Sequence, residues 1–209
     1  MKKISSRTSL LVLSLSLSMV LAACGEKTSP PAAELAQQEP LKQKVAELLK
    51  KAESGDALAQ LDLGEIYASG EGLPKDSARA ADLFRQAAKQ GIDRAQFRLG
   101  QLYVRGEGVP KDAVLAADLF KQSARSGYAK AQATLGAMYA RGEGVTRDEV
   151  LAYAWSALAA EHGELDAKQV EESVTLNAAL REEAVRLKTK WKQGMEIVRE
   201  KQEAAVPAK

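Results

Sequence analysis

The chain has one cysteine, one histidine and few aromatic residues, and each shortage excludes a class of protein. With Cys24 as the only cysteine, no intramolecular disulfide can form. With His162 as the only histidine, the usual zinc sets of cysteine and histidine cannot be assembled. Aromatic residues make up 5% of the 209 residues, which together with abundant alanine favours close-packed helices over a sheet. We therefore expect no metal and no cofactor.

Catalytic motifs are missing from the sequence as well. It contains no phosphate-binding P-loop and no serine three residues ahead of a lysine. No serine–histidine–acid or cysteine–histidine system stands out around the single histidine. We expect no catalytic residue and no small-molecule substrate, and hence a protein that is not an enzyme.

No long run of apolar residues is present. The longest such segment, residues 10–22, is interrupted by serines and follows a basic start with Lys2, Lys3 and Arg7. It is too short to span a bilayer as a helix and predicts a signal peptide over residues 1–23. Once the signal peptide is removed, the chain keeps 27 basic residues (30 − 3) and 28 acidic residues, so it is close to neutral. This balance does not support nucleic-acid binding.

The signal peptide ends in Leu-Ala-Ala-Cys at residues 21–24. This segment resembles the lipobox of bacterial lipoproteins, which implies that Cys24 is lipidated and becomes the first residue of the mature chain. Gly25 follows the cysteine where retained lipoproteins have aspartate, which implies the outer membrane, with the protein lipid-anchored and facing the periplasm. The alternative is an ordinary signal peptide followed by an incidental thiol.

The rest of the chain is organised around a segment that occurs three times. Residues 63–76 return as residues 99–112 and 135–148, each 36 residues after the last, and each carries Leu-Gly, a tyrosine, a Gly-Glu-Gly triplet and an aspartate. A fixed period of this length predicts a repeat array. We refer to the three repeats as copies one, two and three.

Each copy predicts a pair of helices. In copy one, Ala59, Leu63, Ile66 and Tyr67 share one helical face. We expect this helix to end at Gly70, and the next to begin after Asp76, whose carboxylate caps it. The glycine inside the first helix, at positions 64, 100 and 136, predicts that another backbone approaches there. A lone helix pair cannot bury its apolar face, so the copies must stack.

These residues resemble the Sel-one-like repeat (SLR) family of tetratricopeptide-like solenoids over residues 56–163. The resemblance implies an all-α, right-handed αα-solenoid of three 36-residue helix pairs, with residues 56–91, 92–127 and 128–163 as the repeats. We further expect a flexible tether over residues 24–40 and an N-terminal capping helix over residues 41–55. Capping helices over residues 164–203 and a disordered tail over residues 204–209 complete the predicted organisation.

One basic stripe departs from the repeat pattern. In copy two, four polar residues recur at helical spacing along one face of the first helix, opposite the apolar face. In copy three, two basic residues lie at matching positions of the first helix. These residues, here called the basic stripe, are Arg94, Arg98, Gln101, Arg105, Lys130 and Arg141. First helices line the concave face of such solenoids, so the stripe predicts a groove for an acidic or C-terminal carboxylate peptide. The alternative is a solvated face.

The resemblance implies a protein–protein adaptor, as its relatives serve in envelope assembly, in regulation of cell-wall enzymes and in host contact. We therefore expect a periplasm-facing lipoprotein whose partner is an envelope protein, with its membrane contact made through the lipid on Cys24. Two alternatives stay open: binding of an anionic envelope glycan or lipid by the basic stripe, and a cell-wall or β-lactam-related enzyme.

Overall fold

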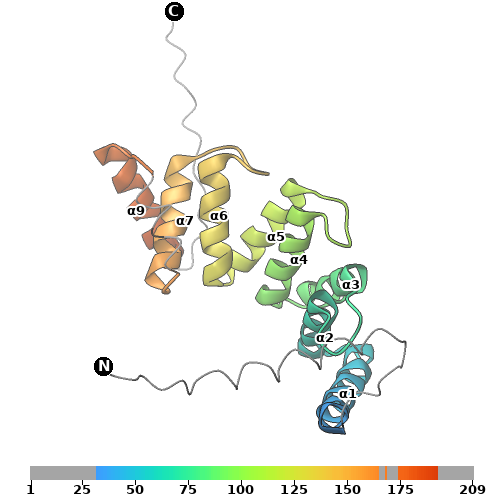
Figure 1. Ribbon diagram of the computed structural model, residues 1–209. Helices are drawn as coiled ribbons and strands as arrows, with labels where there is room; N and C mark the ends of the chain where they lie inside the picture. Colours follow the sequence, from blue (N-terminus) through green and yellow to red (C-terminus); the bar gives the residue numbers. More distant parts are fainter. Residues whose placement is uncertain (1–31, 165–167, 169–173, 193–209) are drawn as a thin grey trace, which may run out of the picture. The chain divides into compact units, whose positions relative to one another are not determined.

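A computed structural model describes residues 32–164, 168 and 174–192 of the chain, and every regular element in that part is a helix (Figure 1). The elements are α1 (Ala32–Glu53), α2 (Ala57–Ser69), α3 (Ser77–Lys89), α4 (Asp93–Arg105), α5 (Ala113–Arg125), α6 (Ala129–Arg141), α7 (Glu149–Glu161) and α9 (Ala178–Lys192). The predicted all-α class is confirmed. No helix among the described residues is long and apolar enough to cross a bilayer.

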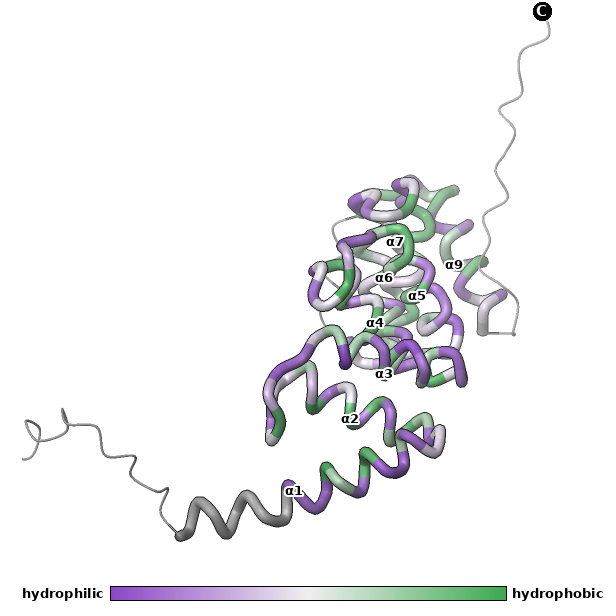
Figure 2. The backbone as a smooth tube through the Cα atoms, turned by 90° about the vertical axis from the view of Figure 1, so that its right-hand side faces the viewer, coloured by the Kyte–Doolittle hydropathy of each residue, from purple (hydrophilic) through white to green (hydrophobic). Residues whose placement is uncertain are grey.

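Helices α2 to α7 form three consecutive pairs, one for each copy. Partners pack within each pair, and the second helix of one copy packs against the first helix of the next. Figure 1 shows these helices stacked in chain order. Polar and apolar residues alternate along α3 and α4 (Figure 2), as expected where a helix buries one face and exposes the other, whereas α7 is apolar along most of its length and largely buried. The expected solenoid of helix pairs is therefore confirmed.

The predicted helix ends are confirmed at both kinds of boundary. Asp112 accepts hydrogen bonds from the backbone N–H groups of Val114 and Leu115 at 3.0 and 2.9 Å. Asp148 caps α7 through two such bonds and Asp76 caps α3 through one. Gly106 closes α4 with a φ of +71°. A side-chain carboxylate at one end and a left-handed glycine at the other thus satisfy groups that the helix leaves unpaired.

The glycine inside each first helix is a close-packing position, but its neighbour differs from the one we expected. A Cβ on Gly64 or Gly100 would lie 2.6 or 2.7 Å from the ring of Phe84 or Phe120. The expected close backbone is wrong for these two copies, because an aromatic ring of the second helix fills the space. In copy three, Ser156 stands where the others have phenylalanine, and backbone does come near.

The Gly-Glu-Gly loops hold successive copies together. Gly108 and Gly144 have φ values of +69° and +67°. A Cβ on Gly108 would lie 2.2 Å from the carbonyl carbon of Ser77, and one on Gly144 would lie 2.0 Å from the carbonyl oxygen of Ala113. Each loop therefore lies directly against the start of the second helix in the preceding copy, a contact that only glycine permits.

A buried glutamine fastens each first helix to the copy before it. Gln60, Gln96 and Gln132 are all at most 7% exposed. Each donates its side-chain N–H to a carbonyl oxygen eight residues earlier, of Ala52, Ala88 and Ala124, at 3.1 to 3.4 Å. The apolar pattern of the sequence did not indicate this row of buried amides.

The amide oxygens of these glutamines are satisfied unequally. Gln90 donates to Gln60 at 2.9 Å, and His162 lies 3.2 Å from the oxygen of Gln132. In copy two the corresponding residue is Ser126, whose hydroxyl bonds to its own helix instead. The oxygen of Gln96 has no hydrogen-bond partner among the described residues, because serine is too short to reach it.

Helix α1 begins earlier than expected. Residues 32–40, predicted to belong to the tether, are helical, and the chain divides into two units at Pro40, within α1. The tether was predicted from two adjacent prolines at residues 30 and 31 and from the small polar residues near them. The residues between these prolines and Pro40 are mostly alanine, leucine, glutamate and glutamine, which are strong helix formers.

A helix packs against each end of the repeat array: α1 at the N-terminal end and α9 at the C-terminal end. Val45 and Ala52, in the part of α1 that belongs to the second unit, are buried. Ala184 and Leu187 of α9 belong to the core formed by copies two and three. Helix α9 packs against α7. The remainder of the predicted C-terminal helices, like the signal peptide and Cys24, lies outside the described residues.

Candidate binding groove on the first helices

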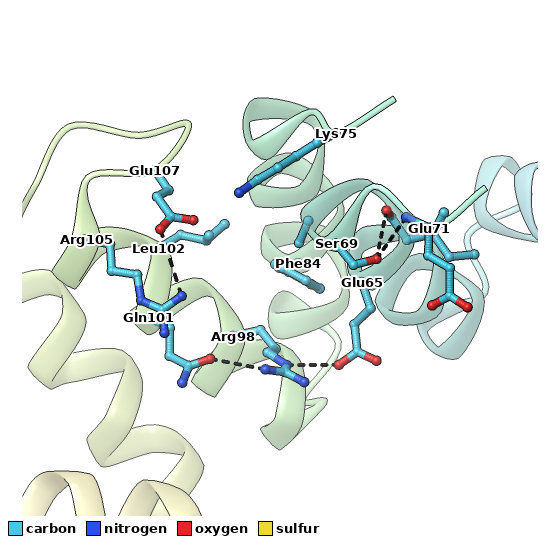
Figure 3. Close-up of a pocket in the computed structure, with 12 residues that line it drawn as sticks. Glu65, Ser69, Glu71, Lys75, Phe84, Arg98, Gln101, Leu102, Arg105 and Glu107 are labelled. Atoms are coloured by element: carbon cyan, nitrogen blue, oxygen red, sulfur yellow. Dashed lines mark hydrogen bonds and ion pairs between the residues drawn. The ribbon is translucent and has the colours of Figure 1, made fainter. Parts of the chain in front are cut away.

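A pocket of about 430 Å³ opens between the first helices of copies one and two (Figure 3). Its volume lies within the range of ligand-binding clefts. Its floor is apolar and is formed by Ile66, Ala68, Phe84 and Leu102. Its rim is polar and comprises Glu65, Ser69, Glu71, Lys75, Arg98, Gln101, Arg105 and Glu107. This combination suits a ligand with one apolar group and charged neighbours.

Three residues of the predicted basic stripe line this pocket: Arg98, Gln101 and Arg105. Arg94 does not line the pocket, but it forms an ion pair with Glu65, which also pairs with Arg98. Lys130 and Arg141 lie at the start and end of α6 and do not line the pocket. The structure thus groups the part of the stripe that lies on α4, and it places the two remaining cations on the next first helix.

Glu65 of copy one engages two arginines of the stripe. Its carboxylate oxygens lie 2.7 Å from Nη2 of Arg94 and 2.9 Å from Nε of Arg98. Arg98 also donates to the side-chain oxygen of Gln101 at 3.3 Å. The side chains of Arg94 and Arg98 remain 46% and 40% exposed. One carboxylate therefore orders two cations, and a net positive charge stays accessible.

The loop glutamates pair with the cations that end the first helices. Nη1 of Arg105 is 3.9 Å from Glu107, and Nε of Arg141 is 2.9 Å from Glu143. Surface pairs of this kind contribute about 0–1 kcal/mol. The looser pair borders the pocket, so Arg105 can reorient toward a ligand without losing a strong bond.

Lys75 is the pocket residue that the sequence reading missed. It follows Pro74 in the loop, and Figure 3 shows its side chain extending toward Glu107 and Leu102. The signal was available, because Lys111 and Arg147 put a cation at the same position of the other copies. Lys75 was predicted only as part of the repeat motif, and Asp76 beside it as a helix cap, so neither was expected in a binding groove.

Tyrosines of the repeats are packing residues in the described structure. Tyr67 is 8% exposed, and its hydroxyl accepts a hydrogen bond from Arg79 at 3.2 Å. Burial raises the pKa of the Tyr139 phenol above its ordinary value, and it does the same for Tyr128, although the nearby charges of Arg94 and Arg98 oppose that rise. These phenols therefore stay protonated at neutral pH.

Few groups in the described residues could perform metal chemistry. No three histidine, cysteine, aspartate or glutamate side chains cluster there in a way that could hold an ion. His162 is exposed, as its repeat position predicts, and its Nδ1 faces Gln132. What the site offers is charge and apolar surface for binding.

A comparison with family profiles matches the Sel1 repeat at residues 57–92, 93–128 and 129–164. These three stretches of 36 residues cover more than half of the 209 residues. The comparison with curated proteins gave no match.

Several solved structures are similar to this chain. A Sel1 repeat protein from Oxalobacter formigenes is 38% identical, with a TM-score of 0.57 over 62% of this chain and 98% of its own. A protective antigen of uropathogenic Escherichia coli with an SLR fold is also 38% identical, with a TM-score of 0.61 over 72% of this chain and 33% of its own. The present chain thus spans about a third of that antigen. Cysteine-rich protein B of Helicobacter pylori, 21% identical with a TM-score of 0.51 over 64% of this chain and 96% of its own, shares the fold.

Proposed function

This chain belongs to the Sel1 repeat family, and on that premise we propose that it is an adaptor that binds an envelope protein through the groove on its first helices. Proteins built from these repeats are generally non-catalytic scaffolds for protein–protein interaction. The observation that carries the proposal is the pocket itself: Arg98, Gln101 and Arg105 line it, and the two arginine side chains are 40% and 60% exposed.

The charge of the groove favours an acidic segment of the partner. Arginine binds carboxylates through paired N–H groups, so a partner can use the arginines of the stripe in a defined orientation. Lys130 and Arg141 on α6 extend the same sign of charge to copy three. Association driven in this way weakens as the salt concentration rises.

We expect Arg98→Glu combined with Arg105→Glu to abolish capture of the partner from solubilised bacterial envelopes, because both carboxylates would repel an acidic segment. Bound proteins are identified by mass spectrometry over a series of salt concentrations, and circular dichroism checks that the helix content is unchanged. Lys50→Glu combined with Lys89→Glu is the matched control, since both lysines are exposed and lie outside the pocket.

Lysines are chosen for this control because two arginines of α3, Arg79 and Arg85, donate to tyrosine hydroxyls, and their replacement would disturb the packing. If the groove variant captures the same proteins at the same salt concentration as the wild type, the proposed binding surface is wrong. If the species that depends on Arg98 and Arg105 is an anionic glycan or lipid, the adaptor function gives way to that alternative.

The lipobox-like segment at residues 21–24 supports a location at the outer membrane, with the array facing the periplasm. Several acyl chains on one cysteine give stable anchoring, because each buried CH₂ contributes about 0.8 kcal/mol. We expect Cys24→Ser to remove incorporation of labelled palmitate and to release the protein from the membrane fraction, with an unchanged melting temperature. Equal labelling of the variant and the wild type would contradict lipidation at Cys24.

A further inference from the structure

The apolar floor of the pocket between α2 and α4 is closely packed. Phe84 is 1% exposed, and its ring fills the space that a side chain on Gly64 would need. Leu102 is 5% exposed, and Ile66 and Ala68 are half-buried beside it. Ile66 and Ala68 therefore present the accessible apolar surface to a ligand, and Phe84 and Leu102 support it from the core.

Two charge clusters flank this floor, and each carries one excess positive charge. In the first, Glu65 opposes Arg94 and Arg98. In the second, Glu107 opposes Arg105 at 3.9 Å and faces Lys75. Lys75 has no hydrogen bond or ion pair with any residue that the structure describes.

Glu71 is the remaining acid of the rim, and Figure 3 shows its carboxylate pointing away from Lys75 and Arg105. It therefore leaves the excess positive charge of the second cluster in place. A carboxylate of a ligand can bind Lys75 and Arg105 without breaking a short bond inside the protein. A second carboxylate can share the arginines that Glu65 holds in position.

We propose that this pocket binds a segment of the partner in which an apolar side chain stands between two acidic residues. The inference rests on the proposed adaptor function and specifies its ligand. The apolar side chain enters the pocket against Ile66 and Ala68, and the two carboxylates contact the flanking clusters. Such an anchor combines a desolvated apolar contact with charge complementarity. An anionic glycan would use the cations and leave the apolar floor empty.

The test uses a short blocked peptide, acetyl-Gly-Ser-Asp-Leu-Glu-Ser-Gly-amide, titrated into the full nitrogen-15-labelled chain and followed by NMR. We expect shifts to concentrate in the backbone amides of residues 64–76 and 98–108. Replacing the leucine by serine, or both acids by their amides, should each weaken binding by roughly tenfold, which corresponds to about 1.4 kcal/mol.

Two variants of the protein carry the same substitution at equivalent positions of copies one and two. Lys75→Gln should weaken binding of the peptide by about three- to tenfold, consistent with a charged hydrogen bond at an exposed site. Lys75→Arg should retain it, since the charge remains. Lys111→Gln, which makes the same change at the corresponding position of copy two, should leave the affinity unchanged. Binding that ignores the leucine, or that Lys75→Gln and Lys111→Gln weaken equally, overturns the proposal.

The proposed ligand and the proposed adaptor function can be contradicted separately. If the peptide does not bind the wild-type chain while envelope proteins are still captured through Arg98 and Arg105, the assigned ligand chemistry is wrong and the adaptor function stands. If neither peptide nor envelope protein depends on the pocket, both are wrong.

Discussion

Gly144→Ala is expected to lower the free energy of unfolding by roughly 2–5 kcal/mol, because it combines two separate costs. The backbone of Gly144 has a φ of +67°, which an alanine adopts only with strain. The added Cβ would lie 2.0 Å from the carbonyl oxygen of Ala113 and 2.5 Å from its carbonyl carbon. Because both neighbours are backbone atoms, the loop must move away from the preceding copy. Denaturant titration followed by circular dichroism measures the change.

Gly127→Ala separates the two contributions. Gly127 also has a positive φ, +91°, but a Cβ there would meet no other atom within 4 Å. We expect it to destabilise the protein by about 1–2 kcal/mol, from backbone strain alone. If both variants lose the same stability, the loop does not lie against Ala113, and the stacking of copies two and three differs from the one described.

Phe120→Ala should destabilise the protein by about 3–5 kcal/mol, the usual cost of truncating a buried aromatic side chain. The ring of Phe120 is 1% exposed, lies against Gly100 and stands 5.4 Å from the ring of Phe97. Its removal leaves a cavity between the two helices of copy two. The same denaturant titration measures the loss, and Leu115→Ala, at a side chain that is 39% exposed, is the control with a small effect.

A second substitution tests the pairing of Phe120 with Gly100 directly. On the wild-type background, Gly100→Ala places a methyl group 2.7 Å from the ring of Phe120. On the Phe120→Ala background the same methyl enters empty space and should be better tolerated. Equal effects on both backgrounds would show that ring and glycine do not interact.

The helix boundaries could be predicted because the determining residues are local. Asp112 caps the helix that begins beside it, and Gly106 ends the helix before it. The neighbour of Gly100 could not be identified in this way. Phe120 lies 20 residues further along, and only the crossing of the two helices of copy two brings its ring over the glycine. The start of α1 was missed for a different reason, since the two prolines at residues 30 and 31 favoured a tether over the helix-forming residues that follow them.

The residues of the candidate binding groove could be predicted only in part. The spacing of Arg94, Arg98 and Arg105 was enough to place them on one exposed face. It did not show that Glu65, 29 and 33 residues before the first two, would bond to both. Such contacts depend on how far one copy is rotated against the next, which no pattern within a copy encodes. Lys75 was missed because its loop had already been explained by a helix cap.

The buried glutamines have a consequence for how such a chain can lengthen. Gln96 donates to the carbonyl oxygen of Ala88, and Gln132 donates to that of Ala124, so each junction between two copies pairs one side-chain N–H with one backbone carbonyl. Tandem duplication of one 36-residue unit would add one such donor and one such acceptor together. The number of copies can therefore change by whole units without leaving the side-chain N–H of the added glutamine unpaired at the new junction.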